Sequence, residues 1–140
     1  MNTSEAALQM LAQASQRLET ARRVSRKKKG GKAYTIRSSQ ECSELALKAA
    51  LRFVGVDYPK RHDVGRVLIE MHARFPSWFE LGEIAEESTW LAERSERAMY
   101  GSESEDQGPE SLFSKEEALT ALKYARHIYG NSKRLVRTKK

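Results

Sequence analysis

Helix-breaking residues are scarce in this 140-residue chain, and their placement constrains its fold more than any other feature. Three prolines and eight glycines are present, and most fall in short segments between long runs rich in Ala, Leu, Glu, Lys and Arg. Proline cannot continue a helix and glycine weakens one, whereas those five residue types favour helices. The sequence therefore predicts an all-α fold, an up-and-down bundle of about five helices.

Breakers and capping signals set the limits of the predicted helices. The first runs from Thr3 or Ser4 to the Gly30–Gly31 pair, and Ser114 opens the last with a capping box that Glu117 completes. The other predicted helices cover about residues 33–54, 64–75 and 78–99, and the last covers 115–136. The chain is predicted to form a single domain over 1–140, with a basic C-terminal tail at 133–140 and an acidic, mobile loop at 100–113.

Positive charge is concentrated in two segments of a chain with net charge +6 and pI ≈ 9.5. Residues 22–37 contain eight Lys or Arg and no acid, and residues 133–140 contain five more. Each segment alone is typical of a solvated loop or tail. If the two segments meet in space, they favour a polyanionic partner such as RNA. The candidate phosphate-binding residues of this basic patch are Lys27, Lys28, Lys29, Lys32 and Arg37.

Several classes of protein are disfavoured by the sequence. Cys42 is the single cysteine, so neither a disulfide within the chain nor a cysteine-based metal site is expected. The three histidines form no H-x-x-x-H or HExxH motif, and the sequence predicts no metal and no cofactor. No apolar run approaches 18 residues and the N-terminus lacks signal-peptide character, so we expect a cytoplasmic protein with no membrane partner.

The segment "QECSELALK" carries a polar stripe on an otherwise apolar helix. Gln40, Glu44 and Lys48 stand at spacings of i, i+4 and i+8, which places them on one face. The stripe is either a solvated face whose ion pair contributes about 0.3–0.5 kcal/mol, or the floor of a site.

Three segments carry a resemblance to a known family. The stretch "SSQECSELALKAALRFVGV", the triplet His62-Asp63-Val64 and the stretch "SKEEALTALKYAR" resemble the second helix, the H-D marker and the terminal helix of HEPN domains. The resemblance covers about residues 8–136. It implies a helical bundle that is usually a dimer. The family includes ribonucleases, nucleotide-binding modules and the partners of minimal nucleotidyltransferases in toxin–antitoxin pairs.

The nucleotide-binding branch of that family implies a site between the polar stripe and the end of the fourth helix. Arginine grips phosphate through two parallel hydrogen bonds and tyrosine stacks on a base, although the proline of the branch's "R-Y-P" pattern is absent here. His62 is included in this site, with bracing of the third helix as its structural alternative. The residues that the resemblance assigns to nucleotide or phosphate binding are Gln40, Glu44, Lys48, His62, Arg94, Arg97 and Tyr100.

The nuclease branch of the family is matched only in part. His127 and Tyr129 resemble its "H-x-Y" element, but residues 120–122 hold no arginine, and Lys123 supplies charge without a guanidinium fork. We expect a non-catalytic protein that binds nucleotide or RNA phosphates beside a nucleotidyltransferase partner. The alternatives are a metal-independent ribonuclease toxin that assembles His127 and Tyr129 with Arg97 or Lys123 across a dimer, and a structural bundle that docks an acidic protein.

Three aromatic residues are expected in the core or a dimer interface: Trp78, Phe79 and Trp90.

Overall fold

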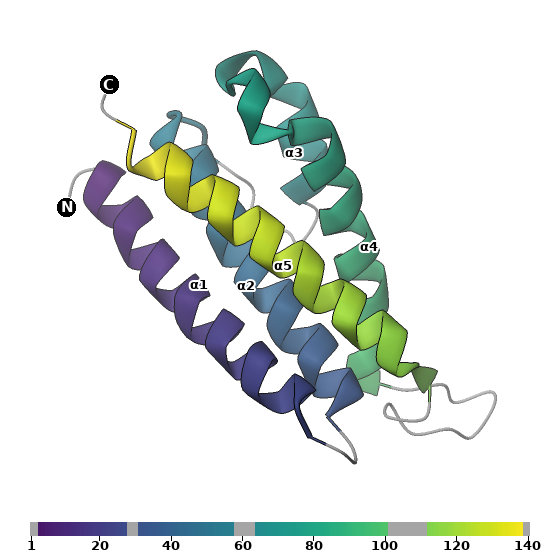
Figure 1. Cartoon of the computed structure of the whole chain (residues 1–140). Helices are drawn as coiled ribbons and strands as arrows, with labels where there is room; N and C mark the ends of the chain where they lie inside the picture. The colour runs from purple at the N-terminus through teal and green to yellow at the C-terminus, as the bar shows by residue number, and fades with distance from the viewer. Residues whose placement is uncertain (1–2, 28–30, 58–63, 101–111, 139–140) are drawn as a thin grey trace.

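The protein is an antiparallel helical bundle (Figure 1). The computed structural model describes residues 3–27, 31–57, 64–100 and 112–138, and this part of the chain contains no strand. The elements are α1 (Thr3–Ser25), α2 (Lys32–Phe53), α3 (Val64–Glu70), the 3₁₀ turns η1 (His72–Arg74) and η2 (Ser77–Phe79), α4 (Leu81–Tyr100) and α5 (Lys115–Val136). The prediction of an all-α bundle with five helices is confirmed. None of the described helices is both long enough and apolar enough to span a bilayer.

Helix α2 is the central element of the bundle and packs against α1, α4 and α5. Figure 1 shows that α2 and α5 run in one direction while α1 and α4 run in the other. The small and branched apolar side chains of α2 fill the core together with residues of α4 and α5. Fully buried examples are Leu47, Leu51, Leu91 and Ile128. Removal of this apolar area from water is the main source of stability in such a fold.

Gly31 makes the tight link between α1 and α2 possible. Its φ of 85° lies in the left-handed region, which glycine adopts without steric cost. A Cβ at this position would lie 2.8 Å from Val24 Cγ1 and 3.0 Å from the Val24 carbonyl oxygen. The Gly31 carbonyl accepts hydrogen bonds from the amide of Thr35 at 2.8 Å and from its hydroxyl at 2.7 Å. Both the backbone conformation and the contact with α1 therefore require glycine.

The third helix is shorter than predicted. We expected it to cover 64–75, but α3 ends at Glu70 and the chain tightens into η1. Pro76 disfavours the helical conformation at the preceding residue, and Phe75 is extended with φ −111° and ψ 140°. Arg74 Nη1 donates to the carbonyl oxygens of Val54 at 3.0 Å and Gly55 at 3.3 Å, so η1 is tied to the end of α2.

The fourth helix begins later than predicted. Ser77, Trp78 and Phe79 form η2, and Glu80 adopts a left-handed conformation with φ 59° before α4 starts at Leu81. Phe79 is fully buried, as predicted, and its ring lies 4.7 Å from that of Phe75. Packing of these two rings joins the residues on either side of Pro76.

The start of α5 agrees with the sequence signal. The Ser114 hydroxyl accepts from the Glu117 amide at 3.1 Å, and Glu117 Oε1 accepts from the Ser114 amide at 3.2 Å. The predicted capping box is therefore confirmed.

The described parts of the two basic segments do not meet. Residues 22–37 surround the link between α1 and α2, whereas residues 133–138 lie near the N-terminus at the opposite end of the bundle (Figure 1). Helix α5 continues to Val136, and both Leu135 and Val136 are buried, so the first half of the predicted basic tail is part of the folded helix. A combined basic pole, the condition that favoured a polyanionic partner, is absent from the described structure.

Candidate functional site

The polar stripe of α2 is a connected network. Gln40 Nε2 donates to Glu44 Oε2 at 3.1 Å, and Lys48 Nζ lies 2.8 Å from Glu44 Oε1. The Glu44 and Lys48 side chains are only 13% and 19% exposed. The stripe is therefore neither a fully solvated face nor a set of free ligands, because the charge of Lys48 is already balanced by Glu44.

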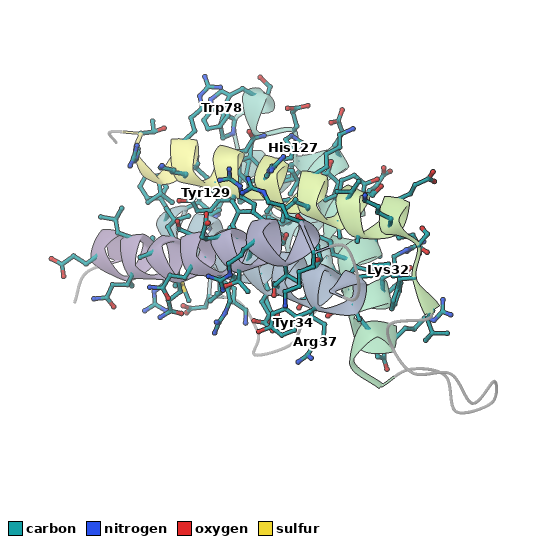
Figure 2. All side chains as sticks on the ribbon, turned by 60° about the horizontal axis from the view of Figure 1, so that its bottom comes forward. Lys32, Tyr34, Arg37, Trp78, His127 and Tyr129 are labelled. Carbon is teal, nitrogen blue, oxygen red and sulfur yellow. The ribbon has the colours of Figure 1, made fainter. Side chains whose placement is uncertain are left out.

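Arg37 extends this face toward the start of α2. It is half-buried, and its Nε is shielded from solvent without a hydrogen-bond partner in the described part of the chain. Its guanidinium carbon lies 5.9 Å from the ring centroid of Tyr34, which is 50% exposed. Figure 2 shows both side chains on the side of the bundle away from Trp78 and His127. A shielded donor next to an open aromatic ring is suited to an anionic ligand that carries a base.

The end of α4 leaves one of its two predicted arginines exposed. Because α4 runs opposite to α2, its last turn lies at the end of the bundle where α2 begins (Figure 1). Arg97 is exposed there. Arg94 instead packs into the fold, with its guanidinium carbon 4.0 Å from the Trp90 ring centroid and its Nε 3.6 Å from Glu117 Oε2. The side chain of Tyr100 lies outside the described residues.

The remaining basic candidates do not form one compact patch. Lys27 is exposed after the end of α1, whereas Lys28, Lys29 and His62 lie outside the described residues. Lys32 and Arg37 are five positions apart on α2, which separates them by about 140° around the helix axis. The structure therefore pairs Arg37 with Tyr34 and leaves Lys32 on another face.

His127 lies in a second polar group, which joins α5 to the start of α4. His127 Nδ1 lies 2.8 and 3.0 Å from the two carboxylate oxygens of Glu87, and its Nε2 lies 3.2 Å from Glu80 Oε1. Asn131 Nδ2 donates to the Phe79 carbonyl at 2.9 Å and lies 3.3 Å from His127 Nε2. Glu83 places a carboxylate oxygen within 4.8 Å of ligand atoms of Glu80 and His127. We call Glu80, Glu83, Glu87, His127 and Asn131 the His127 cluster.

Ionisation of the cluster reflects competition between burial and charge. Burial by itself would lower the pKa of His127, but hydrogen bonds to Glu87 and Glu80 and their negative charge raise it above its ordinary value. Burial raises the pKa of Glu87 against the opposing effect of His127. The pKa of Glu80 is lowered, chiefly by its hydrogen bond with His127. The imidazole is thus surrounded by carboxylates, which disfavour a phosphate at this position.

The nuclease candidates are not assembled within one chain. Glu87 contacts His127, and Arg97 is ten residues further along α4, a distance of about 15 Å along the helix axis. Tyr129 is half-buried, with Lys133 Nζ 5.7 Å from its ring centroid. Lys123 is exposed one turn before His127. The described geometry therefore gives His127 carboxylate partners where the nuclease pattern calls for an arginine.

Four members of the His127 cluster were not identified from the sequence. Glu83 and Glu87 follow the spacing i, i+4 on α4, as His127 and Asn131 do on α5, so each pair lies on one face of its helix, and Glu80 stands in the left-handed turn just before α4. This spacing was a usable signal. It does not reveal that the two faces meet, since that depends on how α4 packs against α5.

Comparison with known proteins agrees with the fold and the motifs. The family model of the HEPN domain matches residues 7–135 of this chain. Searches of curated proteins and of solved structures found no match.

Proposed function

Because this chain belongs to the HEPN domain family, we propose that it binds the phosphates of a nucleotide or a short RNA where α2 begins and α4 ends. Arg37 and Arg97 are the proposed phosphate ligands, and Tyr34 is the proposed stacking surface. The observation that carries the proposal is the half-buried Arg37, whose shielded Nε has no acceptor in the described residues, beside the half-exposed Tyr34 ring.

The chemistry of these side chains favours this ligand over an acidic protein. A shielded N–H without an acceptor costs about 1–3 kcal/mol, and rotation of the half-buried Arg37 side chain toward the surface would let a phosphate oxygen accept from it. Base stacking on an aromatic ring contributes about 1–3 kcal/mol per base and tolerates any base. A carboxylate ligand would satisfy the arginine but would leave the Tyr34 ring without a stacking partner.

The polar stripe has a supporting role in this proposal. Gln40 follows Arg37 by one turn, and its amide has both donor and acceptor groups for ribose hydroxyls or base edges. Glu44 holds Gln40 at 3.1 Å and Lys48 at 2.8 Å, which restricts the rotamers of both side chains before a ligand arrives. The stripe would then orient the sugar and base, while Arg37 and Arg97 hold the phosphates.

The test is fluorescence anisotropy with a labelled ten-nucleotide RNA, together with thermal shift in the presence of AMP, ADP and ATP. We expect Arg37→Ala and Arg97→Ala each to weaken binding about tenfold, equivalent to about 1.4 kcal/mol. The logarithm of the association constant falls linearly with the logarithm of the salt concentration. Each substitution should make this fall less steep by about 0.7 for every phosphate contact that is lost. Arg126→Ala is the matched control, because Arg126 is an exposed arginine on α5 and its loss changes the net charge equally.

Three outcomes would count against the proposal. Equal weakening by Arg37→Ala and Arg126→Ala would mean that only net charge matters, and absence of binding would leave the protein-docking alternative. RNA recovered from the assay and run on a gel should be intact. Cleavage that disappears in His127→Ala would instead support the ribonuclease alternative.

Assembly is a separate part of the proposal. HEPN domains commonly dimerise, and we propose a homodimer that acts with a separately encoded nucleotidyltransferase. Exposed large apolar side chains on the described surface are spread over several helices, as in Leu8, Ile69 and Leu119. Light scattering after size-exclusion chromatography should give twice the 15.9 kDa chain mass, and a monomer at micromolar concentration would contradict the dimer.

A further inference from the structure

The geometry points to a binding site for a divalent transition-metal cation in the His127 cluster, with His127 Nε2 and the carboxylates of Glu80 and Glu83 as ligands. This site is separate from the phosphate-binding region proposed above, and the sequence alone predicted no metal. The three ligands come from the turn before α4, from α4 and from α5, so two of them are more than forty positions from the third in the sequence.

The ligand atoms are already close together. One carboxylate oxygen each from Glu80 and Glu83 and a ring nitrogen of His127 all lie within 4.8 Å of one another. The Nε2 to Glu80 Oε1 distance of 3.2 Å is close to the ~3.4 Å that separates two ligands around a tetrahedral ion with bonds of about 2.1 Å. Glu80 and Glu83 are exposed, so small rotations of their side chains complete the site without a change in the backbone.

The imidazole is held in the orientation that metal-binding histidines adopt. Its Nδ1 faces both oxygens of Glu87, which is only 15% exposed and therefore has little freedom to move. A neutral imidazole that donates from Nδ1 presents a lone pair at Nε2. Pairing of one ring nitrogen with a carboxylate and the other with an ion is a recurrent arrangement around bound metals, because the carboxylate fixes the ring and raises its basicity.

The neighbours of Nε2 are one hydrogen-bond donor and one carboxylate oxygen. Asn131 Nδ2 is oriented by its hydrogen bond to the Phe79 carbonyl and faces Nε2 at 3.3 Å, which suits a lone pair on that nitrogen. Glu80 Oε1, at 3.2 Å, is an acceptor that would repel the same lone pair. A cation between Nε2 and Glu80 attracts the lone pair and the carboxylate together, and it binds in competition with a proton on Nε2 and in place of the Asn131 contact.

The ligand set also indicates the type of ion. Imidazole nitrogen with carboxylate oxygens suits Zn²⁺ or Mn²⁺, whereas Mg²⁺ prefers oxygen ligands alone. Three carboxylates surround the site, and the described residues place no Lys or Arg in an ion pair with Glu80, Glu83 or Glu87. Three protein ligands leave a coordination position open for water or a small ligand.

Isothermal titration calorimetry of untagged, chelator-treated protein with zinc, manganese and magnesium chloride tests the site. We expect one ion per chain for zinc or manganese and at least about tenfold weaker binding in Glu83→Gln. Glu83 is exposed and forms no ion pair with His127, so this substitution removes a ligand and leaves the His127–Glu87 contact in place. Glu86→Gln is the matched control, since Glu86 is an exposed glutamate on the same helix. His72→Gln controls for binding at another histidine.

A second readout separates metal binding from a structural role. Zinc should raise the unfolding temperature of the wild-type protein and of Glu86→Gln, with a smaller rise in Glu83→Gln. The inference would be overturned if the wild-type protein bound neither zinc nor manganese at about 100 µM metal, which is roughly the dissociation constant of a weak specific site. Equal zinc affinity in Glu83→Gln and the wild type would do the same, because the ion would then lie elsewhere. RNA affinity should be the same in Glu83→Gln and the wild type, so failure of the metal site and failure of the phosphate site are distinguishable.

Discussion

The guanidinium of Arg94 stacks on the indole of Trp90, with the guanidinium carbon 4.0 Å from the ring centroid. The Trp90 ring in turn meets Tyr124 of α5 edge-on, at 5.2 Å between centroids. Glu117 at the start of α5 lies 3.6 Å from Arg94 Nε. Arg94 therefore belongs to the contact between α4 and α5, although it stands one turn before the exposed Arg97.

We expect Arg94→Ala to lower the free energy of unfolding by about 1–2 kcal/mol, since it removes the cation–π contact and a partly exposed ion pair. Urea denaturation measures this change. Arg97→Ala is the control, with an expected change below about 0.5 kcal/mol for an exposed residue. RNA affinity should respond in the opposite way, with a loss in Arg97→Ala and little change in Arg94→Ala. Equal stability of the two variants would contradict the structural role of Arg94.

Gly31→Ala should destabilise the protein by about 1–3 kcal/mol, because alanine is strained at φ 85° and its Cβ would lie 3.0 Å from the Val24 carbonyl oxygen. Gly130→Ala is the matched substitution inside α5, where an added Cβ meets no atom within 4 Å. That change should stabilise the helix by about 0.5–1 kcal/mol. Thermal unfolding of the two variants should therefore shift in opposite directions, and a shift in the same direction would argue against the left-handed link.

Cys42 should resist alkylation in the folded protein. The residue is 0% exposed, and burial raises the pKa of its thiol to about 12, so the reactive thiolate is scarce at pH 8. Iodoacetamide labelling, followed by mass spectrometry, should be slow in buffer and rapid in urea at about 8 M, because urea at that concentration unfolds a small domain. Since Cys42 is the single cysteine, the whole signal reports on it. Labelling at equal rates in both conditions would show that α2 is not buried as described.

Ser114→Ala should cost about 1 kcal/mol, because it removes the hydroxyl that accepts from the Glu117 amide. Ser114→Asp keeps an acceptor at the same position and adds a charge that the helix N-terminus favours, so it should retain most of the stability. Chemical denaturation of both variants checks the prediction. A loss of similar size in Ser114→Asp would mean that the hydroxyl has another role.

Local signals predicted most of the helical structure. Gly31, Ser114 and Glu117 act through neighbouring residues, and the ends of α2 and α5 were predicted to within a residue or two. The predicted bounds of the third and fourth helices were less accurate. The break between them depends on the packing of Phe75 against Phe79 and on the hydrogen bond from Arg74 to the Val54 carbonyl at the end of α2. The contact of Arg74 with Val54 joins residues 20 positions apart, and periodicity contains no information about it.

The candidate sites were predictable to different degrees. The Gln40–Glu44–Lys48 network follows from helical spacing alone, and the structure adds its partial burial. The stacking of Arg94 on Trp90 follows from their i, i+4 spacing on α4, but the ion pair of Arg94 with Glu117 depends on tertiary packing and could not be read from the sequence. The contacts of His127 with Glu80 and Glu87 span 47 and 40 positions, and they depend on the relative rotation of α4 and α5.

Helix α2 has 22 residues and is therefore about 33 Å long, which is roughly the separation of the two basic ends of the bundle. A mononucleotide is far shorter than this and can reach one end only, whereas a strand with bases stacked at about 3.4 Å needs roughly ten nucleotides to extend from one end to the other. Affinity for single-stranded RNA should therefore rise gradually with length up to that size and more steeply beyond it. Ligand length, rather than sequence, would then determine whether one end of the molecule is used or both.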